Sequence, residues 1–392
     1  MSNDFTLPKQ GFVFWPVGCG DSTTIVVNDE TVMQIDLRHM AQADDEKDPA
    51  IGVIDELQRL LPKKDGKPYL AVFALTHPDD DHIHGFEELL KQVTIGEIWH
   101  TPRIFRDYED EIDLCEAAEA FRKEVHRRRE AVIANPSNVK AGDRVRVIGH
   151  DDILNEDKYK DFPKERTSMP GTSITTLDDS NVSDVCEVFV HAPFKVDPAD
   201  SRNNTSLSMQ LTLKRGDNDA TALFFGDREY PTTKMIFDVT VEHDREQYLS
   251  WDLLLSPHHC SKRTMYWKDD GENEVFKQDI MDYFEKYRRD GAFIIASANC
   301  DFTDGDGDNP PHSKARKQYE KIVDAGQFIC THEHSTAKEP RPVCFEFSDA
   351  GLNLIGTDSR DAKKSALSAA VAAGRGGETP PQQQVGFGYR HD

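Results

Sequence analysis

Residues 75–86, LTHPDDDHIHGF, bring three aspartates and three histidines into twelve positions. Imidazole and carboxylate groups are common ligands of divalent cations. His77 and Asp79 are two positions apart, so their side chains leave the same side of an extended chain. Asp81 and His82 follow where the chain must turn. This spacing favours a loop with two ligands for each of two cations, and the alternative is an acidic surface loop with unrelated histidines.

Further histidines and aspartates follow apolar runs elsewhere in the chain. The run TALFFGD ends in Asp227, and WDLLLSPHHCSK places His258 and His259 directly after a strand-like run. A site assembled along one edge of a sheet requires such residues at the ends of several strands. The pattern has exceptions, because His191 and Asp252 fall inside or at the start of predicted strands. Apart from these two, the residues are expected to meet the first loop at a sheet edge.

The first loop begins where a predicted strand ends. YLAVFAL before it is a continuous apolar run, which is typical of a strand buried on both faces. IGVIDELQRLL and GFEELLKQV, on either side of that strand and loop, predict helices. β-Branched and aromatic runs predict further strands in GFVFWPV, TTIVV, TVMQIDL, CEVFVHAPF, SLSMQLTL, TALFFGD, WDLLLSP, AFIIASA and VCFEF. In layered α/β folds, loops that follow buried strands are where sites are built.

The order of these elements predicts one α/β domain over residues 1–356, with two sheets between helices. A helical insertion is expected at about 109–180, with a charged helix at about 109–134 and an irregular polar region at 151–180. Its basic run Arg127–Arg129 could contact a phosphate, although a solvated helix face is the simpler interpretation. Residues 357–392 predict an Ala-rich helix and a flexible low-complexity tail with aromatic residues at Phe387 and Tyr389.

Composition narrows the class of protein. The 392 residues carry a formal net charge of −24, which disfavours a passive nucleic-acid coat protein but not an enzyme whose bound cations invert the local field. The seven cysteines form no CxxC pair, which favours reduced thiols in a cytoplasm over a disulfide framework. We see no secretion signal and no apolar run near the ~20 residues of a membrane-spanning helix, so a cytoplasmic protein without a membrane partner is expected.

Several short motifs occur in a particular order: VGCGDS (17–22), MQIDL with Asp36, THPDDDH (76–82), NNTSLSMQLTL followed by ALFFGD, HHCS (258–261) and NPPHSKA (309–315). This order resembles the metallo-β-lactamase fold superfamily, and more narrowly the branch of the hydrolase domain of ComEC-type DNA-uptake proteins. The resemblance covers about residues 11–356 without the insertion. It implies an αββα sandwich of two mixed β-sheets flanked by helices, with the insertion and the tail added.

The resemblance also implies two divalent metal ions, manganese or zinc. It assigns His77 and Asp79 to the first ion, Asp81 and His82 to the second, Asp227 to both, and His258 to the second. In place of a further first-ion histidine the chain offers Asn203 or Asn204. Because carboxylate and amide oxygens replace imidazoles, this ligand set favours manganese, with zinc as the alternative. Cys260 stands where the family prefers glycine, and Cys19 lies inside the first motif.

The implied chemistry is hydrolysis by a metal-bound hydroxide. Asp81 would orient it, and His312, or alternatively His259, would donate a proton to the leaving oxygen. Asp36 and Asp21 are expected to hold ligand side chains in place. The leading hypothesis is a phosphodiesterase or nuclease with an anionic phosphodiester substrate. The alternatives are a lactone, thioester or amide hydrolase, and a scaffold that recruits a protein partner through the tail, in a bacterial defence system for example.

Overall fold

The computed structural model describes residues 5–40, 49–102, 114–197, 202–269, 273–305, 307, 309–336 and 338–355. The chain divides into two units, Met1–Asn353 and Leu354–Asp392, and the sheets described below are built from the first. The predicted Ala-rich helix and tail, with Phe387 and Tyr389, lie outside the described residues. Among the described residues, no helix combines the length and apolar character needed to cross a bilayer.

The larger sheet joins the two ends of this unit. Its strand order is β21-β20-β1-β2-β3-β5-β6-β7-β8, with β4 beside β5. The pairs among β20, β1, β2 and β3 are antiparallel, whereas β3, β5, β6, β7 and β8 run parallel. The strands are β1 (Gly11–Phe14), β2 (Thr23–Val26), β3 (Val32–Ile35), β4 (Lys63–Lys64), β5 (Lys67–Ala74), β6 (Thr94–His100), β7 (Arg144–Ile148), β8 (Thr167–Ser168), β20 (Val343–Ser348) and β21 (Gly351–Leu354).

The second sheet has the order β19-β18-β15-β14-β13-β12-β9. It is also mixed, because β12, β13 and β14 are antiparallel whereas β14, β15, β18 and β19 are parallel. Its strands are β9 (Ser173–Ile174), β12 (Cys186–Ala192), β13 (Ser208–Arg215), β14 (Asn218–Phe224), β15 (Trp251–Leu255), β18 (Arg288–Ala296) and β19 (Phe328–Cys330). Two small hairpins stand apart: β10 (Thr176–Leu177) with β11 (Ser180–Asn181), and β16 (Tyr266–Trp267) with β17 (Val275–Phe276).

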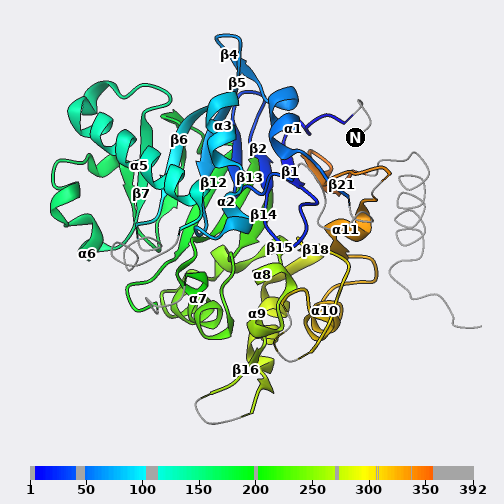
Figure 1. Cartoon of the computed structure of the whole chain (residues 1–392). Helices are drawn as coiled ribbons and strands as arrows, with labels where there is room; N and C mark the ends of the chain where they lie inside the picture. Colours follow the sequence, from blue (N-terminus) through cyan, green and yellow to red (C-terminus); the bar gives the residue numbers. More distant parts are fainter. Residues whose placement is uncertain are drawn as a thin grey trace, which may run out of the picture. The chain divides into compact units, whose positions relative to one another are not determined.

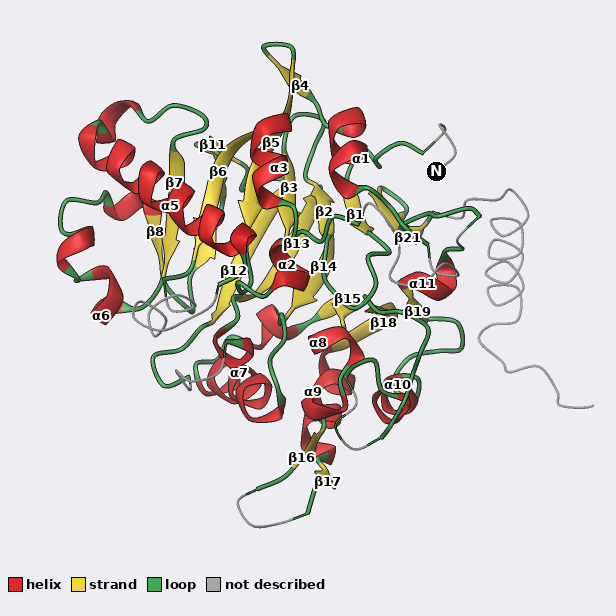
Figure 2. Cartoon of the chain, in the orientation of Figure 1, coloured by secondary structure: helices red, strands yellow, loops and turns green. Residues whose placement is uncertain are grey.

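Helices cover the outer face of each sheet (Figures 1 and 2). On the larger sheet, α1 contacts β5, α3 contacts β6 and α5 contacts β7. On the second sheet, α7 contacts β12. The helices are α1 (Val53–Leu60), α2 (Asp80–Ile83), α3 (Phe86–Gln92), α5 (Glu116–Ala134), α6 (Asp151–Leu154), α7 (Tyr230–Glu242), α8 (Pro257–Cys260), α9 (Gln278–Tyr287), α10 (Ser313–Tyr319) and α11 (Thr331–His334). This layering confirms the expected fold class, an αββα sandwich of two mixed sheets.

Aromatic side chains join the layers. Phe73 of β5 packs against Phe86 of α3, with ring centroids 5.1 Å apart, and so fixes a helix to the larger sheet. Phe237 of α7 and Phe284 of α9 meet edge to face at 5.4 Å in the core outside the second sheet. Between the sheets, Phe345 of β20 contacts Phe293 of β18 at 5.1 Å. Each buried phenylalanine contributes about 1.5–3 kcal/mol through burial alone.

The insertion is more regular than its sequence predicts. α5 is the expected charged helix. β7 is a strand that the sequence did not predict, before the region expected to be irregular, and β8 continues the larger sheet within that region. The polar composition misleads because β7 alternates buried valines with Arg146, whose buried guanidinium lies 3.4 Å from the carboxylate of Glu97. The basic run on α5 is structural: Arg128 donates to the backbone carbonyls of Ile95 and Gly96, and Arg127 pairs with Glu124.

Candidate metal centre

The carboxyl ends of parallel strands from both sheets meet at one place. Asp36 follows β3, the loop with His77 follows β5, Asp227 follows β14, and His258 follows β15. Backbone hydrogen bonds hold these loops together: the amide of Asp36 donates to Ala74, and that of His258 donates to Gly226. The sheet register therefore brings segments far apart in the sequence to one edge.

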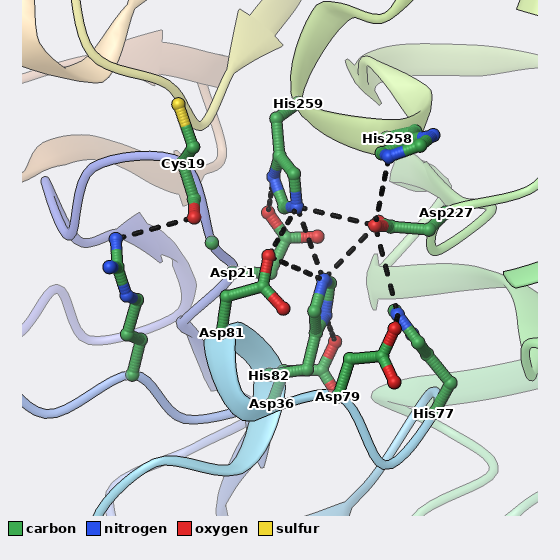
Figure 3. Close-up of polar contacts among 12 residues, drawn as sticks. Cys19, Asp21, Asp36, His77, Asp79, Asp81, His82, Asp227, His258 and His259 are labelled. Carbon is green, nitrogen blue, oxygen red and sulfur yellow. Dashed lines mark hydrogen bonds and ion pairs between the residues drawn. The ribbon is translucent and has the colours of Figure 1, made fainter. Parts of the chain in front are cut away.

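Asp227 is the centre of the site. Four imidazoles surround its buried carboxylate, as Figure 3 shows. Nε2 of His82 lies 3.2 Å from Oδ1. Around Oδ2, Nε2 of His259 lies at 3.4 Å, that of His258 at 3.6 Å and that of His77 at 3.7 Å. One carboxylate between imidazoles from two loops is the arrangement expected of a ligand shared by two cations.

The most compact group of donor atoms is Asp21, His82, Asp227 and His259. One donor atom from each lies within 4.8 Å of the others, and all four residues are buried. Asp81 adjoins this group, with Oδ2 3.3 Å from Nε2 of His259 and 4.0 Å from Nε2 of His82. Three carboxylates and two imidazoles can thus surround one divalent cation.

A looser second group lies on the other side of Asp227. It consists of His77 and His258, which approach the same carboxylate oxygen, and Asp79, whose Oδ2 lies 3.8 Å from Nε2 of His77. The other oxygen of Asp79 pairs with Nη1 of Arg202 at 2.9 Å. Asp79 therefore contacts both the looser donor group and Arg202, a residue that the sequence did not mark as part of the site.

The histidine tautomers follow from hydrogen bonds behind the site. The Thr76 hydroxyl donates to Asp36, so it accepts from Nδ1 of His77. Nδ1 of His82 donates to Asp36 at 2.8 Å, and Nδ1 of His259 donates to the carbonyl of Ser297 at 3.2 Å. Because each Nδ1 carries a proton, each Nε2 can offer a lone pair towards Asp227, which is the form that binds metals.

These donors fit a bound cation. Nε2 of His82 and Nε2 of His259 face each other at 3.2 Å, so a proton or a cation must lie between their lone pairs. Nε2 of His77 is buried and has no hydrogen-bond partner among the described residues. Leaving such an atom without a partner costs about 1–3 kcal/mol, which a cation at this position would offset.

The electrostatics of the metal-free site also call for positive charge. Burial would raise the pKa of Asp227, but the surrounding imidazoles lower that pKa well below its usual range. Burial would lower the pKa of His82 and of His259, yet the nearby carboxylates raise both well above the usual value. His77 differs, because burial lowers its pKa to about 3. Without a metal, protonation of the His82–His259 pair offsets the charge of the clustered carboxylates.

The turn after β15 has an uncommon backbone conformation. His258, His259 and Cys260 are consecutive left-handed residues, with φ of 49°, 51° and 66°. For residues other than glycine such conformations cost of order 1–3 kcal/mol each, and they cluster at functional sites. The turn brings the imidazoles of both histidines to Asp227. Cys260, the last residue of this turn, is fully buried, so its thiol is packed in the interior.

Two histidines lie in other groups than the sequence predicts. The prediction puts His258 with Asp81 and His82, and makes His259 the alternative to His312 as proton donor. Instead His259 completes the compact group with Asp21, and His258 lies beside the looser one. Adjacent side chains of the turn point in different directions, which spacing alone does not reveal. Asp21 was expected only to hold a ligand, and its contact with Nδ1 of His259 at 3.5 Å is compatible with that role.

Asn204 has other contacts than those expected. Its side-chain oxygen accepts hydrogen bonds from the Glu229 amide at 3.1 Å and the Thr232 hydroxyl at 2.6 Å, at the start of α7. The neighbouring Asn203 begins the same 3₁₀ turn, η4 (Asn203–Thr205). These contacts fix the turn to α7, and metal ligation by either asparagine stays a prediction.

His312 is buried beside the His258–Cys260 turn. Its Nδ1 accepts a hydrogen bond from the backbone amide of Lys262 at 3.2 Å, and its own amide donates to Cys260. A neutral imidazole that accepts at Nδ1 carries its proton on Nε2. His312 therefore has the tautomer that a hydrogen-bond donor requires.

Comparisons with known proteins found likenesses to solved structures. No protein-family model and no curated protein matches the sequence. Among solved structures, the metallo-β-lactamase fold protein YhfI from Bacillus subtilis is similar at 11% identity, covering 86% of this chain and 100% of that one, with a TM-score of 0.40. The class B3 di-zinc metallo-β-lactamase LRA-12 from an Alaskan soil metagenome is similar at 12% identity, covering 73% and 95%, with a TM-score of 0.34.

The subclass B3 enzyme BJP-1 of Bradyrhizobium japonicum is similar at 16% identity, covering 73% of this chain and 93% of that one, with a TM-score of 0.31. The neighbours of this chain among solved structures are thus metallo-β-lactamase fold proteins.

Proposed function

We propose that this protein is a metal-dependent hydrolase that cleaves phosphodiesters with two divalent cations. One observation carries the proposal: the Asp227 carboxylate lies within 3.7 Å of four imidazoles from two different loops. A structural ion pair needs one partner, whereas a carboxylate with four imidazoles suits a ligand shared by two metals. A cation pair supplies an activated water and neutralises charge on the transferring group.

Access to the site supports a catalytic rather than a structural centre. His77 and His82 are fully buried, whereas the side chains of Asp79 and Asp81 are 27% and 34% exposed. The imidazoles thus form the floor, and the two aspartates lie on the open side from which a substrate would approach. Asp81 contacts His259 and also faces solvent, so it can orient a water in the position where the substrate enters.

His312 is the proposed proton donor. Its proton lies on Nε2, since Nδ1 accepts from Lys262, and its backbone is tied to the turn that carries His258 and His259. A donor beside that turn can protonate a leaving oxygen, which is the usual role of histidine in such reactions. His259 is the less suitable donor, because its Nε2 faces His82, Asp81 and Asp227.

The substrate class follows from charge and from the resemblance of the sequence to the ComEC-type branch. Two doubly charged cations favour an anionic substrate, and that branch is associated with DNA degradation. The donors around Asp227 mix imidazoles with carboxylate oxygens, so both manganese and zinc suit the site, and the oxygen-rich members favour manganese.

The test combines metal content with turnover. Mass spectrometry should find close to two metal ions in the wild type and fewer in Asp227→Ala. The same preparations, with manganese or zinc, should be assayed on single- and double-stranded DNA, RNA and cyclic nucleotides. Cleavage by the wild type alone supports the proposal. A metal-loaded protein that cleaves none of them contradicts it.

A second candidate is hydrolysis of a lactone, thioester or amide. The net charge of −24 favours it, because a long-range negative field repels nucleic acid. A panel of chromogenic esters alongside phosphodiesters separates the two candidates, since each predicts turnover of one class only.

A further inference from the structure

Two arginines outside the donor group reach the same edge of the sheets. Arg263 follows the turn with His258 and His259, and its Nη1 donates to Oε1 of Glu229 at 3.0 Å. Glu229 follows Asp227, the central residue of the donor group, by two positions. Arg263 therefore lies on a loop that adjoins the proposed metal centre.

The second arginine, Arg202, lies in the connection between β12 and β13. Its Nη1 pairs with Asp79, and it precedes η4, which Asn204 ties to Glu229 through a hydrogen bond from Nδ2 to Oε2 at 3.4 Å. Asp79 thus pairs with Arg202, which lies two positions before Asn204 in the chain. Asn204 and Arg263 in turn both donate to the carboxylate of Glu229. We call these five residues the rim.

Arg263 has hydrogen-bonding capacity beyond its ion pair with Glu229. The Arg263 side chain is 59% exposed, and its described contact with Glu229 uses one of three guanidinium nitrogens. An ion pair this exposed contributes only about 0–1 kcal/mol to stability, so the Arg263–Glu229 pair does little to stabilise the fold. A guanidinium has five donors in a planar fork that matches the oxygens of a phosphate. In a chain with a net charge of −24, an anionic substrate needs such local positive charge.

We propose that Arg263 and Arg202 form an anion subsite at the rim, which binds a phosphate of the substrate adjacent to the one held at the metal centre. This inference rests on the proposed function and narrows the substrate to a molecule with more than one phosphate, such as an oligonucleotide. Arg263 contributes binding, and Arg202 additionally positions Asp79.

The subsite is tested by binding, separately from cleavage. A single-stranded phosphorothioate oligonucleotide is titrated into manganese-loaded protein over a series of salt concentrations. Arg263→Ala should weaken binding about tenfold, since a hydrogen bond to a charged group is lost. The slope of log affinity against log salt should fall by about 0.7, the value for one single-strand phosphate contact. Arg263→Lys, which keeps the charge, should restore part of both.

Controls separate the subsite from folding and from metal binding. Arg289→Ala also removes an arginine paired with a carboxylate, Asp219, but at the amino end of β18, and it should leave affinity and slope unchanged. The metal content of Arg263→Ala should equal that of the wild type. For Arg202→Ala, a further loss of metal is expected through Asp79.

The outcomes distinguish this inference from the proposed function. If wild type cleaves an unmodified oligonucleotide while Arg263→Ala binds the phosphorothioate as tightly as the wild type, the subsite is refuted and the hydrolase remains. Binding that depends on Arg263 without any cleavage supports the subsite and counts against phosphodiester hydrolysis. No binding by the wild type overturns the subsite.

Discussion

Oδ2 of Asp36 accepts a hydrogen bond from Nδ1 of His82 at 2.8 Å, and both side chains are fully buried. The same carboxylate accepts from the amide and hydroxyl of Thr76 at 2.7 and 2.6 Å. Asp36 itself is left-handed, with φ of 54°, and the Gln34 amide donates to its carbonyl. One carboxylate thus fixes the ring of His82 directly and that of His77 through Thr76.

Asp36→Asn should weaken metal binding without unfolding the protein. The amide keeps the shape but loses the charge that holds Nδ1 of His82, and loss of such an outer partner costs about 10–100-fold in metal affinity. Competition with a chelating dye measures the affinity. Asp252→Asn is the control, because Asp252 accepts hydrogen bonds from Thr221 at the other end of β15. Equal affinities of both variants and the wild type would count against this role of Asp36.

His259→Ala and His258→Ala should differ in their effect on metal content. Both histidines approach Oδ2 of Asp227, but His259 belongs to the compact group with Asp21 and His82, whereas His258 lies in the looser group. We expect His259→Ala to lose more affinity than the roughly 10–100-fold of an outer-shell change, and His258→Ala to lose less than His259→Ala. Metal analysis after dialysis measures both. The reverse order would restore the grouping expected from the sequence.

Much of the site could be predicted from sequence because its residues follow strands. His77, Asp79, Asp81 and His82 lie on one loop, and an apolar run before each of Asp227 and the His258–His259 pair marks a strand end. The central strands of each sheet could be predicted for a similar reason. Strands buried on both faces are continuous apolar runs, which can be recognised without knowing the neighbouring strand. Local pattern therefore predicts the order of these elements and marks the segments that carry most of the donor residues.

The remaining features depend on contacts between distant segments. Which of His258 and His259 completes the compact group is decided by three successive left-handed residues, and composition does not encode that conformation. Asp21 enters through the packing of its loop, whose amide donates to the Asp81 carbonyl. β7 was missed because Arg146 interrupts its apolar pattern, and its partner Glu97 lies on another strand. Arg202 and Arg263 carry no local signal at all.

Metal affinity should rise with pH. In the metal-free protein the pKa values of His82 and His259 are raised above their usual value, so the facing pair holds a proton that a cation must displace. Affinity should increase between about pH 6 and 8, by up to about tenfold per unit for each proton released. Titration calorimetry in two buffers of different ionisation enthalpy counts those protons. Binding without proton release would contradict the charge balance described above.

The raised pKa values of His82 and His259 also predict how the stability of the metal-free protein changes with pH. A raised folded-state pKa of His82 and His259 contributes stability that is fully present below about pH 6.5 and is lost as pH rises through the folded pKa. The melting temperature of chelator-treated protein should therefore fall on the alkaline side, and added manganese should restore it. A metal-free melting temperature that rises over this range would oppose the assignment.

His312→Gln should reduce turnover with little effect on metal content. Glutamine retains a hydrogen-bonding side chain but cannot deliver a proton as imidazole does, and loss of general acid catalysis costs about 10²–10⁴-fold in kcat. Steady-state kinetics on the cleaved phosphodiester, with metal analysis of the same sample, measures both. His243→Gln, at the end of α7, is the control. An unchanged kcat would remove His312 from the reaction.

Gly226 and Gly216 form a matched pair that tests how Asp227 is positioned. Both are left-handed, with φ of 59° and 58°, but a Cβ at Gly226 would lie 2.7 Å from Cβ of Ser206, whereas Gly216 has open space around it. Alanine at either position incurs the backbone cost of order 1 kcal/mol. Gly226→Ala must in addition move the loop that carries Asp227, so it should lower both the melting temperature and the metal affinity, whereas Gly216→Ala lowers only the former. If both variants bind metal equally well, the position of Asp227 does not depend on close packing against Ser206.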